Sequence, residues 1–309
     1  MRKCCLHNGF FQITGHKVPL ELQNKIIDWN REFFNLLLEQ KNTVNKGDIT
    51  SDPVGNLSNR WIDTTNTWNR GYELMEPQIL EEGTLPELKE GFYIGDEISK
   101  DHPYLVQKKL NSGPNMWPPE DILPNVADFK ATALEYYSQV VSLAKDILKV
   151  LALTLDLEKG WFNDFAKEAV ATMRLLHYPS QPPDSPAKLT RGIGAHTDFG
   201  CITILLQDKV AGLKVYDYST KEWLDVTPTP GAFVVNLGNL MMRWVNDRYI
   251  SNLHRVINVS GAERYSIPVF FQRKPGLCGQ VSAKLRQRRR RAEMATDFSR
   301  ASDQERIFG

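Results

Sequence analysis

The stretch Gly194-Ala195-His196-Thr197-Asp198-Phe199-Gly200 places a histidine and a carboxylate two residues apart, directly before the apolar run Cys201-Ile202-Thr203-Ile204-Leu205-Leu206. Such a β-branched run is typical of a β-strand. Residues i and i+2 of a strand point to the same face, so His196 and Asp198 are expected to project side by side. An imidazole and a carboxylate on one face are two parts of a metal site. A third ligand must come from elsewhere in the sequence.

The candidate third ligand is His254, in Ser251-Asn252-Leu253-His254-Arg255-Val256 at the start of a later predicted strand. Two histidines and one carboxylate leave positions open on the metal, as in the facial triad of non-haem Fe(II) oxygenases. A closed zinc site needs a fourth ligand, often cysteine. Cys201 follows Asp198 by three residues, which strand alternation places on the opposite face. The pattern therefore favours iron, although either histidine taken alone is more often structural.

A second polar pattern lies in Arg264-Tyr265-Ser266-Ile267-Pro268-Val269-Phe270-Phe271. Alternation places Arg264 and Ser266 on one face and the large apolar side chains on the other. A guanidinium and a hydroxyl that point into a barrel are costly unless they meet an anion. Their geometry suits a carboxylate. The structural alternative is a salt bridge from Arg264 to an acidic residue of the core.

The composition is that of an ordinary soluble globular protein, with 309 residues, 41% of them hydrophobic and 24% charged. A formal net charge of +1 gives no reason to expect a nucleic-acid or membrane partner. No run approaches the ~18 apolar residues of a membrane span, and the first residues lack the apolar core of a signal peptide. Four cysteines without a framework spacing suit a reducing compartment. We expect a cytoplasmic protein with a small-molecule substrate, and the oligomeric state stays open.

The order of predicted elements indicates a single domain over residues 1–309. Residues 1–125 begin with a strand-like run, Gly9–His16, followed by a helix over Pro19–Lys41 with apolar residues at spacings of three and four. The remainder of this part, up to Pro124, is rich in loop-forming residues and in aromatics such as Trp61 and Trp68. Such a segment is expected to wrap a core.

The rest of the chain divides into a helix, a β-rich region and a tail. Apolar periodicity predicts a long helix near residues 128–155. Over about 169–275 the period changes to two, which predicts a barrel or double-sheet roll. The predicted strands are Ala171–Tyr178, Cys201–Gln207, Leu213–Asp217, Trp223–Val226, Ala232–Leu237, His254–Val259 and Tyr265–Phe271. Residues 280–309 form an atypical basic and polar tail. Its run Lys284–Arg291 is interpreted as solvated, with nucleic-acid binding as the weaker alternative.

These motifs resemble the 2-oxoglutarate- and Fe(II)-dependent dioxygenases of the isopenicillin N synthase-like family. The resemblance covers roughly residues 5–275, and three motifs carry it: His196-Thr197-Asp198, His254-Arg255-Val256 and Arg264-Tyr265-Ser266. It implies a mainly β core, a double-stranded β-helix (jelly roll) with flanking α-helices.

The resemblance also implies roles for these residues. His196, Asp198 and His254 would ligate Fe(II), and Arg264 and Ser266 would hold the distal carboxylate of 2-oxoglutarate. Tyr178, in Leu176-His177-Tyr178-Pro179, matches the family tyrosine that also contacts this cosubstrate. The implied reaction consumes O2, converts 2-oxoglutarate to succinate and hydroxylates, desaturates or cyclises a small organic molecule of secondary metabolism. No catalytic residue is predicted beyond the metal site.

Two alternatives stay open. Relatives with the same Arg-x-Ser pair use it for a substrate carboxylate, so Arg264 and Ser266 also fit an iron oxidase or cyclase that is independent of 2-oxoglutarate. The other alternative is an inactive, truncated family member. Only eight residues precede Gly9, and the tail after Cys278 does not resemble the family's C-terminal helix.

Overall fold

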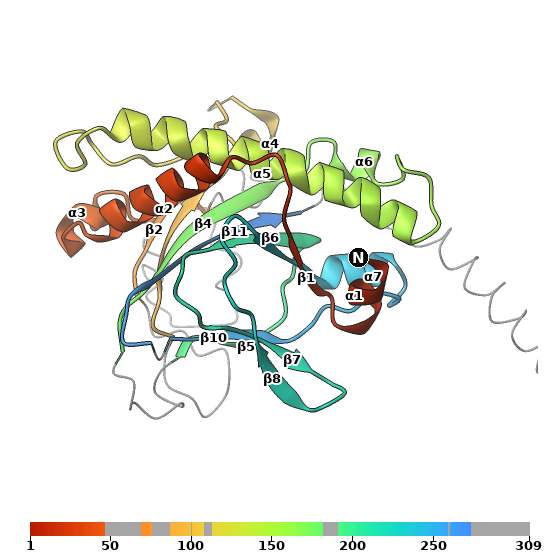
Figure 1. Cartoon of the computed structure of the whole chain (residues 1–309). Coiled ribbons are helices and arrows are strands. Elements are labelled where there is room, and N and C mark those ends of the chain that lie inside the picture. Colours follow the sequence, from red (N-terminus) through yellow and green to blue (C-terminus); the bar gives the residue numbers. More distant parts are fainter. Residues whose placement is uncertain are drawn as a thin grey trace, which may run out of the picture.

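The architecture consists of two antiparallel sheets that face each other, with helices over the outer face of the larger one (Figure 1). This computed structural model describes residues 1–46, 69–75, 87–99, 101–107, 113–181, 191–258 and 260–272. The large sheet contains, in spatial order, β1 (Phe10–Ile13), β9 (Phe233–Leu237), β6 (Ile202–Gln207), β11 (Arg264–Phe271), β4 (Ala171–Tyr178), β3 (Glu90–Ile94) and β2 (Gly71–Glu73). The small sheet contains β5 (Arg191–His196), β10 (His254–Ile257), β7 (Leu213–Asp217) and β8 (Glu222–Asp225). The predicted jelly roll is confirmed.

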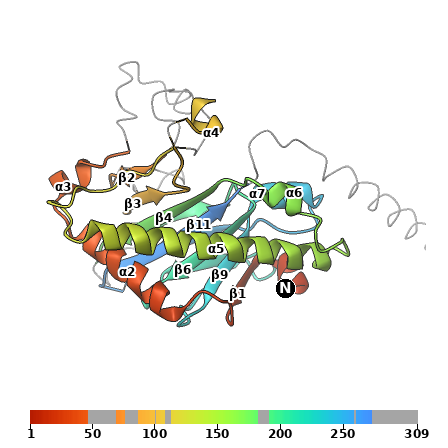
Figure 2. The ribbon, with the colours of Figure 1, turned by 90° about the horizontal axis from the view of Figure 1, so that it is seen from above.

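Two helices, α2 (Leu20–Phe34) and α5 (Val126–Thr154), run across the outer face of the large sheet (Figure 2). The predicted long helix is therefore confirmed. In α5 a stripe of side chains spaced three or four residues apart is fully buried, for example Phe129, Ala133 and Tyr136. The shorter helices are α1 (Arg2–His7), α3 (Leu38–Asn42), α4 (Pro103–Val106), α6 (Asn163–Ala166) and α7 (Asn239–Trp244).

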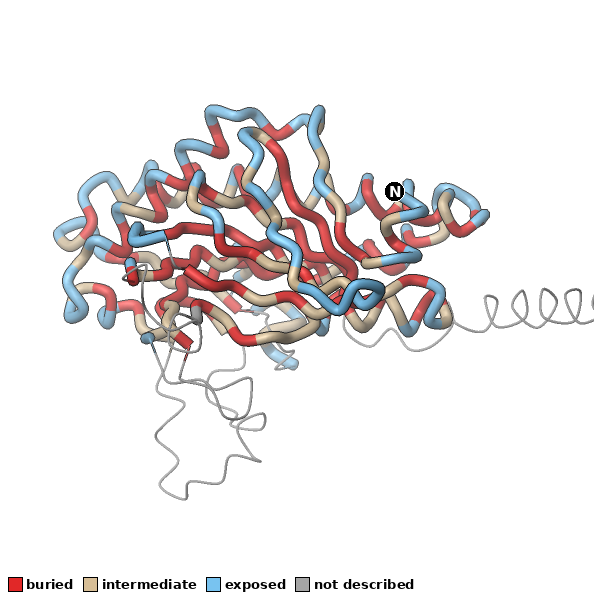
Figure 3. The backbone as a smooth tube through the Cα atoms, turned by 60° about the horizontal axis from the view of Figure 1, so that its bottom comes forward, coloured by how far each residue is buried: buried red, intermediate tan, exposed pale blue. Residues whose placement is uncertain are grey.

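The large sheet has two chemically different faces. On β11, Tyr265, Ile267, Val269 and Phe271 join the apolar core beneath the helices. Burying side chains of this size stabilises the fold by roughly 1.5–3 kcal/mol each. The alternate residues of the same strand face the small sheet, and the strands form the buried centre of the molecule (Figure 3). The helix-side face of β11 is thus apolar, whereas its inner face carries Arg264 and Ser266.

The single helix predicted over Pro19–Lys41 is wrong, because the chain breaks between α2 and α3. Leu37, which fits the apolar period, is 69% exposed and adopts an extended backbone. The break turns α3 so that Lys41 is buried, with its Nζ 2.8 Å from Oε2 of Glu90 on β3. A tertiary ion pair thus overrides the local helical pattern.

The loop-rich reading of residues 42–124 is also wrong in part. β3 pairs with β4, and β2 with β3, so this segment supplies two strands of the large sheet. Every residue of β3 is buried, and Phe92 and Ile94 are 0% exposed. A five-residue strand that begins with Glu90 and Gly91 has little local strand signal, so its pairing with β4 decides the structure. Trp61 and Trp68 lie outside the described residues.

The predicted basic and polar tail, residues 280–309 with the run Lys284–Arg291, lies outside the described residues. Within the described ranges, no helix combines the length and apolar character needed to cross a membrane.

Candidate active site

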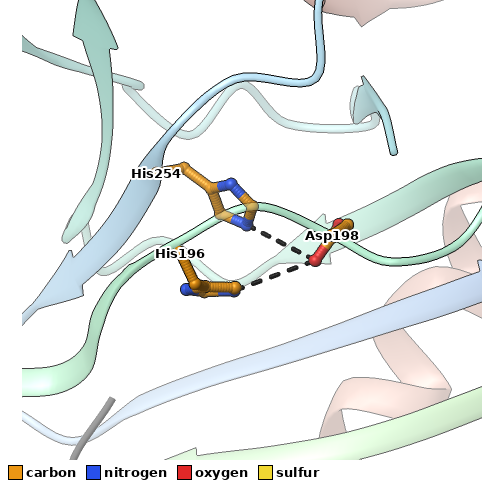
Figure 4. Close-up of side chains that lie close together, drawn as sticks. All are labelled: His196, Asp198 and His254. Carbon is orange, nitrogen blue, oxygen red and sulfur yellow. Dashed lines mark ion pairs between the residues drawn. The ribbon is translucent and has the colours of Figure 1, made fainter. Parts of the chain in front are cut away.

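His196, Asp198 and His254 converge on one point between the sheets (Figure 4). His196 is the last residue of β5 and His254 the first of β10, and the two are direct cross-strand partners. Oδ1 of Asp198 lies 3.8 Å from Nε2 of His196 and 3.7 Å from Nε2 of His254. All three residues offer a ligand atom within 4.8 Å of the other two, so a single ion can contact all of them.

Asp198 reaches the site from a turn. β5 ends at His196 and β6 begins at Ile202, so the interpretation of His196 and Asp198 as neighbours on one strand is wrong. The chain crosses here from the small sheet to the large one, and the carbonyl of Asp198 accepts a hydrogen bond from the Asn239 amide at 2.7 Å. A Cβ at Gly238 would lie only 2.9 Å from that carbonyl oxygen. Glycine therefore lets α7 pack directly against the turn.

Backbone carbonyls orient both imidazoles. Nδ1 of His196 lies 2.8 Å from the Gly194 carbonyl, and Nδ1 of His254 lies 3.2 Å from the Asn252 carbonyl. A proton on Nδ1 leaves the Nε2 lone pair for a metal. Burial, followed by the charge of His254, lowers the pKa of His196. The neutral imidazole that a metal requires is therefore favoured.

Two side chains of the large sheet hold the Asp198 carboxylate. Its Oδ2 accepts hydrogen bonds from the Thr203 hydroxyl on β6 and from Nδ2 of Asn236 on β9, the latter at 2.7 Å. Burial alone would raise the pKa of Asp198, but the charges of His254 and His196 and these two hydrogen bonds outweigh it and lower the pKa. The carboxylate is thus ionised, and Oδ1 is left to face the imidazoles.

The donor set fits Fe(II) better than zinc. Among the described residues, only His196, Asp198 and His254 form a group of possible metal ligands. Cys201, the nearest thiol in sequence, is fully buried in the core beneath the helices, on the other side of the large sheet from this group. Two imidazoles and one carboxylate with no fourth ligand are the facial triad, whereas structural zinc takes four ligands.

Arg264 presents a buried positive charge on the inner face of β11. It is 0% exposed, and its described hydrogen bonds go to neutral groups: Nη1 donates to Ser266 Oγ at 3.3 Å and Nη2 to Gln207 Oε1 at 2.8 Å. Nε is buried and has no hydrogen-bond partner in the described part of the chain. Asp208, the adjacent acid, instead accepts the Tyr265 amide. The described residues therefore do not show the salt-bridge alternative, and a buried guanidinium without an acidic partner favours binding of an anion.

Tyr178 completes this second group. It is paired with Arg264 across β4 and β11, and the Arg264 guanidinium lies 4.9 Å from the centre of its ring. Burial raises the pKa of Tyr178, so its hydroxyl stays protonated. A Cβ at Gly192 would lie 2.5 Å from the ring, which shows how closely β5 packs against it. Arg264, Ser266 and Tyr178 thus lie together on the inner face of the large sheet.

Sequence reasoning missed the side chains that position the predicted ones. Thr203 and Asn236 hold Asp198, and Gln207 holds Arg264. Strand alternation contained part of this signal, because Thr203 and Gln207 have the same parity on β6 and both face the small sheet. The contact between Asn236 and Asp198 could not be predicted from the sequence, because it depends on the pairing of β9 with β6.

Comparison with known proteins decides the family. The sequence model of the 2OG-Fe(II) oxygenase superfamily matches residues 169–273, and that of the N-terminal region of non-haem dioxygenases in morphine synthesis matches residues 1–120. A 2-oxoglutarate-Fe(II) type oxidoreductase of Emericella nidulans, hxnY, is 57% identical, with 89% of this chain and 73% of the relative covered. The chain belongs to the 2OG-Fe(II) oxygenase superfamily.

Other relatives agree with this membership. Clavatol oxidase of Penicillium crustosum is 35% identical, with 88% of this chain and 78% of the relative covered. A full-length Neurospora crassa protein crystallised with alpha-KG (2-oxoglutarate) aligns with a TM-score of 0.72 at 25% identity, covering 88% of this chain and 78% of the other. The predicted cofactors, Fe(II), 2-oxoglutarate and O2, and the enzyme class are therefore confirmed. The comparisons favour a dioxygenase over an oxidase that is independent of 2-oxoglutarate.

Proposed function

We propose that this single-domain chain oxidises a small organic molecule of secondary metabolism in the cytoplasm, with Fe(II) held by His196, Asp198 and His254. The cosubstrate 2-oxoglutarate is held by Arg264, Ser266 and Tyr178. The observation that carries this assignment is the pairing of a three-ligand site with a fully buried arginine on the facing sheet, which has no acidic partner among the described residues. One group demands a cation and the other demands an anion.

Each residue has a separate task in this proposal. The two Nε2 atoms and Oδ1 of Asp198 bind the metal, while Thr203 and Asn236 keep the carboxylate oriented. Arg264 and the Ser266 hydroxyl bind the distal carboxylate of 2-oxoglutarate. The iron, when bound, supplies the O2 chemistry that oxidises substrate and cosubstrate, and the protein contributes orientation and exclusion of water.

Anaerobic spectroscopy tests the assignment directly. Fe(II)-loaded protein is titrated with 2-oxoglutarate without oxygen, and we expect a weak visible charge-transfer band that saturates. His196→Ala should lose the band together with bound iron, measured as metal content after gel filtration. Arg264→Ala should keep the iron and lose the band at the same 2-oxoglutarate concentration.

Three results separate the proposal from its alternatives. A folded, iron-loaded protein without the band contradicts the 2-oxoglutarate site and favours the independent oxidase. A protein without a cooperative melt or without iron binding favours the inactive family member. Succinate released in step with O2 consumption and substrate oxidation supports the dioxygenase.

A further inference from the structure

A second arginine, Arg174, lies on the inner face of the large sheet. It has the same parity on β4 as Leu176 and Tyr178, which pack into the apolar cluster between the two sheets. In β4, all of which the structure describes, Arg174 alone is half-buried and the other residues are buried. In β11, the one half-buried residue is Phe270. On these two strands the half-buried residues are thus a guanidinium and a phenyl ring, and the two are in contact.

The Arg174 guanidinium is stacked on two rings and makes no hydrogen bond to the described residues. Its carbon lies 4.5 Å from the centre of the Tyr93 ring and 4.7 Å from that of Phe270. Its Nε is buried and has no hydrogen-bond partner among the described residues. Stacking on two rings stabilises a cation and leaves the in-plane N–H groups directed away from the rings. The two rings therefore fix the position of the Arg174 guanidinium without accepting its N–H hydrogen bonds.

The neighbouring carboxylates are already occupied. Oε1 of Glu73 lies 2.7 Å from Nζ of Lys46, and its Oε2 accepts the Tyr93 hydroxyl at 2.6 Å. Oε1 of Glu87 accepts the Gly194 amide at 3.1 Å, and its Oε2 lies 3.4 Å from Nζ of Lys89. Three cations, Arg174, Lys46 and Lys89, thus share the two carboxylates Glu73 and Glu87. These five side chains carry one net positive charge, and Arg174 is the cation among them that forms no ion pair with a described carboxylate.

Strand register connects Arg174 to the metal site. Thr203, which holds Asp198, is the direct partner of Phe270 across β6 and β11. Phe270 in turn lies under the Arg174 guanidinium. Arg264 and Tyr178 are paired at one end of the β11–β4 ladder. The other end of this ladder, next to Phe270, is the pair Phe271 and Ala171. A ligand on Arg174 is therefore near the iron site and separate from the proposed 2-oxoglutarate site.

We propose that Arg174 binds a carboxylate of the substrate, so that the enzyme oxidises small organic acids. This inference rests on the proposed function, because it assigns Arg264 to 2-oxoglutarate and leaves Arg174 for the substrate. The planar fork matches a carboxylate, and the partly exposed Phe270 ring offers apolar contact to the remainder of the acid. Arg174 is thus a specificity-determining residue.

The test compares an acid and a neutral isostere on the loaded protein. The full chain, loaded with redox-inert Mn(II) and saturating 2-oxoglutarate, is titrated calorimetrically with benzoate or with benzamide. Saturating 2-oxoglutarate occupies Arg264, so a preference for benzoate reports a second anion site. We expect benzoate to bind at least about tenfold more tightly, and Arg174→Met to reduce this preference to about twofold or less.

Arg255→Met is the matched control. Arg255 is also half-buried and stacked on an aromatic ring, with its guanidinium 4.0 Å from the centre of Trp223. Its parity on β10 is opposite to that of His254, so it lies on the outer face of the small sheet. The preference for benzoate should persist in this variant. If Arg174→Met does not fold, Arg174→Gln carries the same expectation.

The outcomes separate the two proposals. Equal binding of benzoate and benzamide by the wild-type protein, or a preference that survives in the Arg174 variant, overturns the acid site. Normal 2-oxoglutarate binding beside such a result leaves the proposed function intact. Failure of the wild-type protein to bind 2-oxoglutarate overturns both proposals, because the assignment of Arg264 fails first.

Discussion

The two inner-face arginines of the large sheet, Arg264 and Arg174, resemble each other in setting and differ in how they are held. Each guanidinium lies over a tyrosine ring, at 4.9 Å for Tyr178 and 4.5 Å for Tyr93. Arg264 is 0% exposed and fixed by a neutral amide and a hydroxyl, whereas Arg174 is half-buried and, among the described residues, held by stacking on two rings. The buried, pre-oriented guanidinium of Arg264 suits one invariant anion. The half-exposed, stacked guanidinium of Arg174 suits carboxylate ligands whose remaining atoms differ.

Burial sets the strength of the two sites. Breaking a buried, hydrogen-bonded charge pair costs roughly 2–5 kcal/mol, much of it from the charge that is left unpaired. Exposed ion pairs are worth roughly 0–1 kcal/mol. The half-buried Arg174 falls between these limits. We therefore expect a tight and strict site at Arg264, and a weaker and more tolerant one at Arg174.

Arg264→Ala should produce the largest effect. Loss of a buried fork weakens 2-oxoglutarate binding by about 10²- to 10³-fold, measured by the anaerobic charge-transfer titration. Arg264→Lys, which keeps the charge without the fork, should lie between this variant and the wild type. Arg174→Ala should shift the benzoate titration and leave 2-oxoglutarate affinity within about threefold. A similar loss of 2-oxoglutarate affinity in both alanine variants would remove the distinction between the sites.

Gln207→Glu should convert Arg264 into a compensated arginine. The Gln207 oxygen lies 2.8 Å from Nη2, so a carboxylate there would pair with the guanidinium and repel 2-oxoglutarate. We expect affinity to fall by about 10- to 100-fold at pH 7. Gln207→Met, which removes the contact without adding charge, should cost less than tenfold. Acidification to about pH 5 should not restore binding, because the guanidinium lowers the pKa of the introduced acid. Equal losses in both variants would mean that charge compensation is not the cause.

Ser266→Ala tests the smaller component of the Arg264 site. The hydroxyl accepts from Nη1 at 3.3 Å and is 1% exposed, so its removal costs roughly 1 kcal/mol. The Kd for 2-oxoglutarate should rise by about three- to tenfold in the same titration. Ser266→Thr, which retains the hydroxyl, is the control. An unchanged Kd in the alanine variant would show that Arg264 holds the carboxylate without this hydroxyl.

Sequence patterns predicted the inner and outer faces of β11 well, because alternation is a local property. Arg264 and Ser266 face inward and Tyr265 and Ile267 face the helices, as expected. The same rule failed at Asp198, since the chain leaves the strand at His196 to cross between sheets. Alternation describes a strand and gives no warning of where the strand ends.

The features that sequence reasoning missed depend on contacts between distant segments. β3 is a strand because it pairs with β4, and Lys41 is buried because Glu90 lies on β3. The inward orientation of Arg174 could have been predicted from the sequence, since Arg174 has the same parity as Tyr178 in a predicted strand. That Glu73 and Glu87 pair with other groups and not with Arg174 depends on tertiary contacts that the sequence does not reveal.

Glu73→Gln should have the smallest effect on ligand binding, and in the opposite direction. Removing one carboxylate raises the formal charge of the Arg174 group by one, so benzoate should bind about two- to fivefold more tightly. The effect is modest because Glu73 already pairs with Lys46 at 2.7 Å and lies 4.0 Å from Lys89, which partly cancel its field. Affinity for 2-oxoglutarate should not change. Weaker benzoate binding would indicate that Glu73 positions Tyr93, and hence Arg174, more than it opposes the ligand.

The same variant has a defined effect on stability and pH. Burial alone would raise the pKa of Glu73, but Lys46, Lys89 and Arg174 outweigh it and lower the pKa to about 2. A folded-state pKa below the unfolded value of about 4.3 stabilises the protein above that pH, and the stabilisation is lost as the pH falls towards 2. Glu73→Gln should therefore lower Tm at pH 7, and the difference from wild type should shrink below about pH 4.3. Between pH 5 and 8 the Tm difference should be flat, because Glu73 stays ionised there. A Tm difference that varied across that range would assign the coupling to a group other than Glu73.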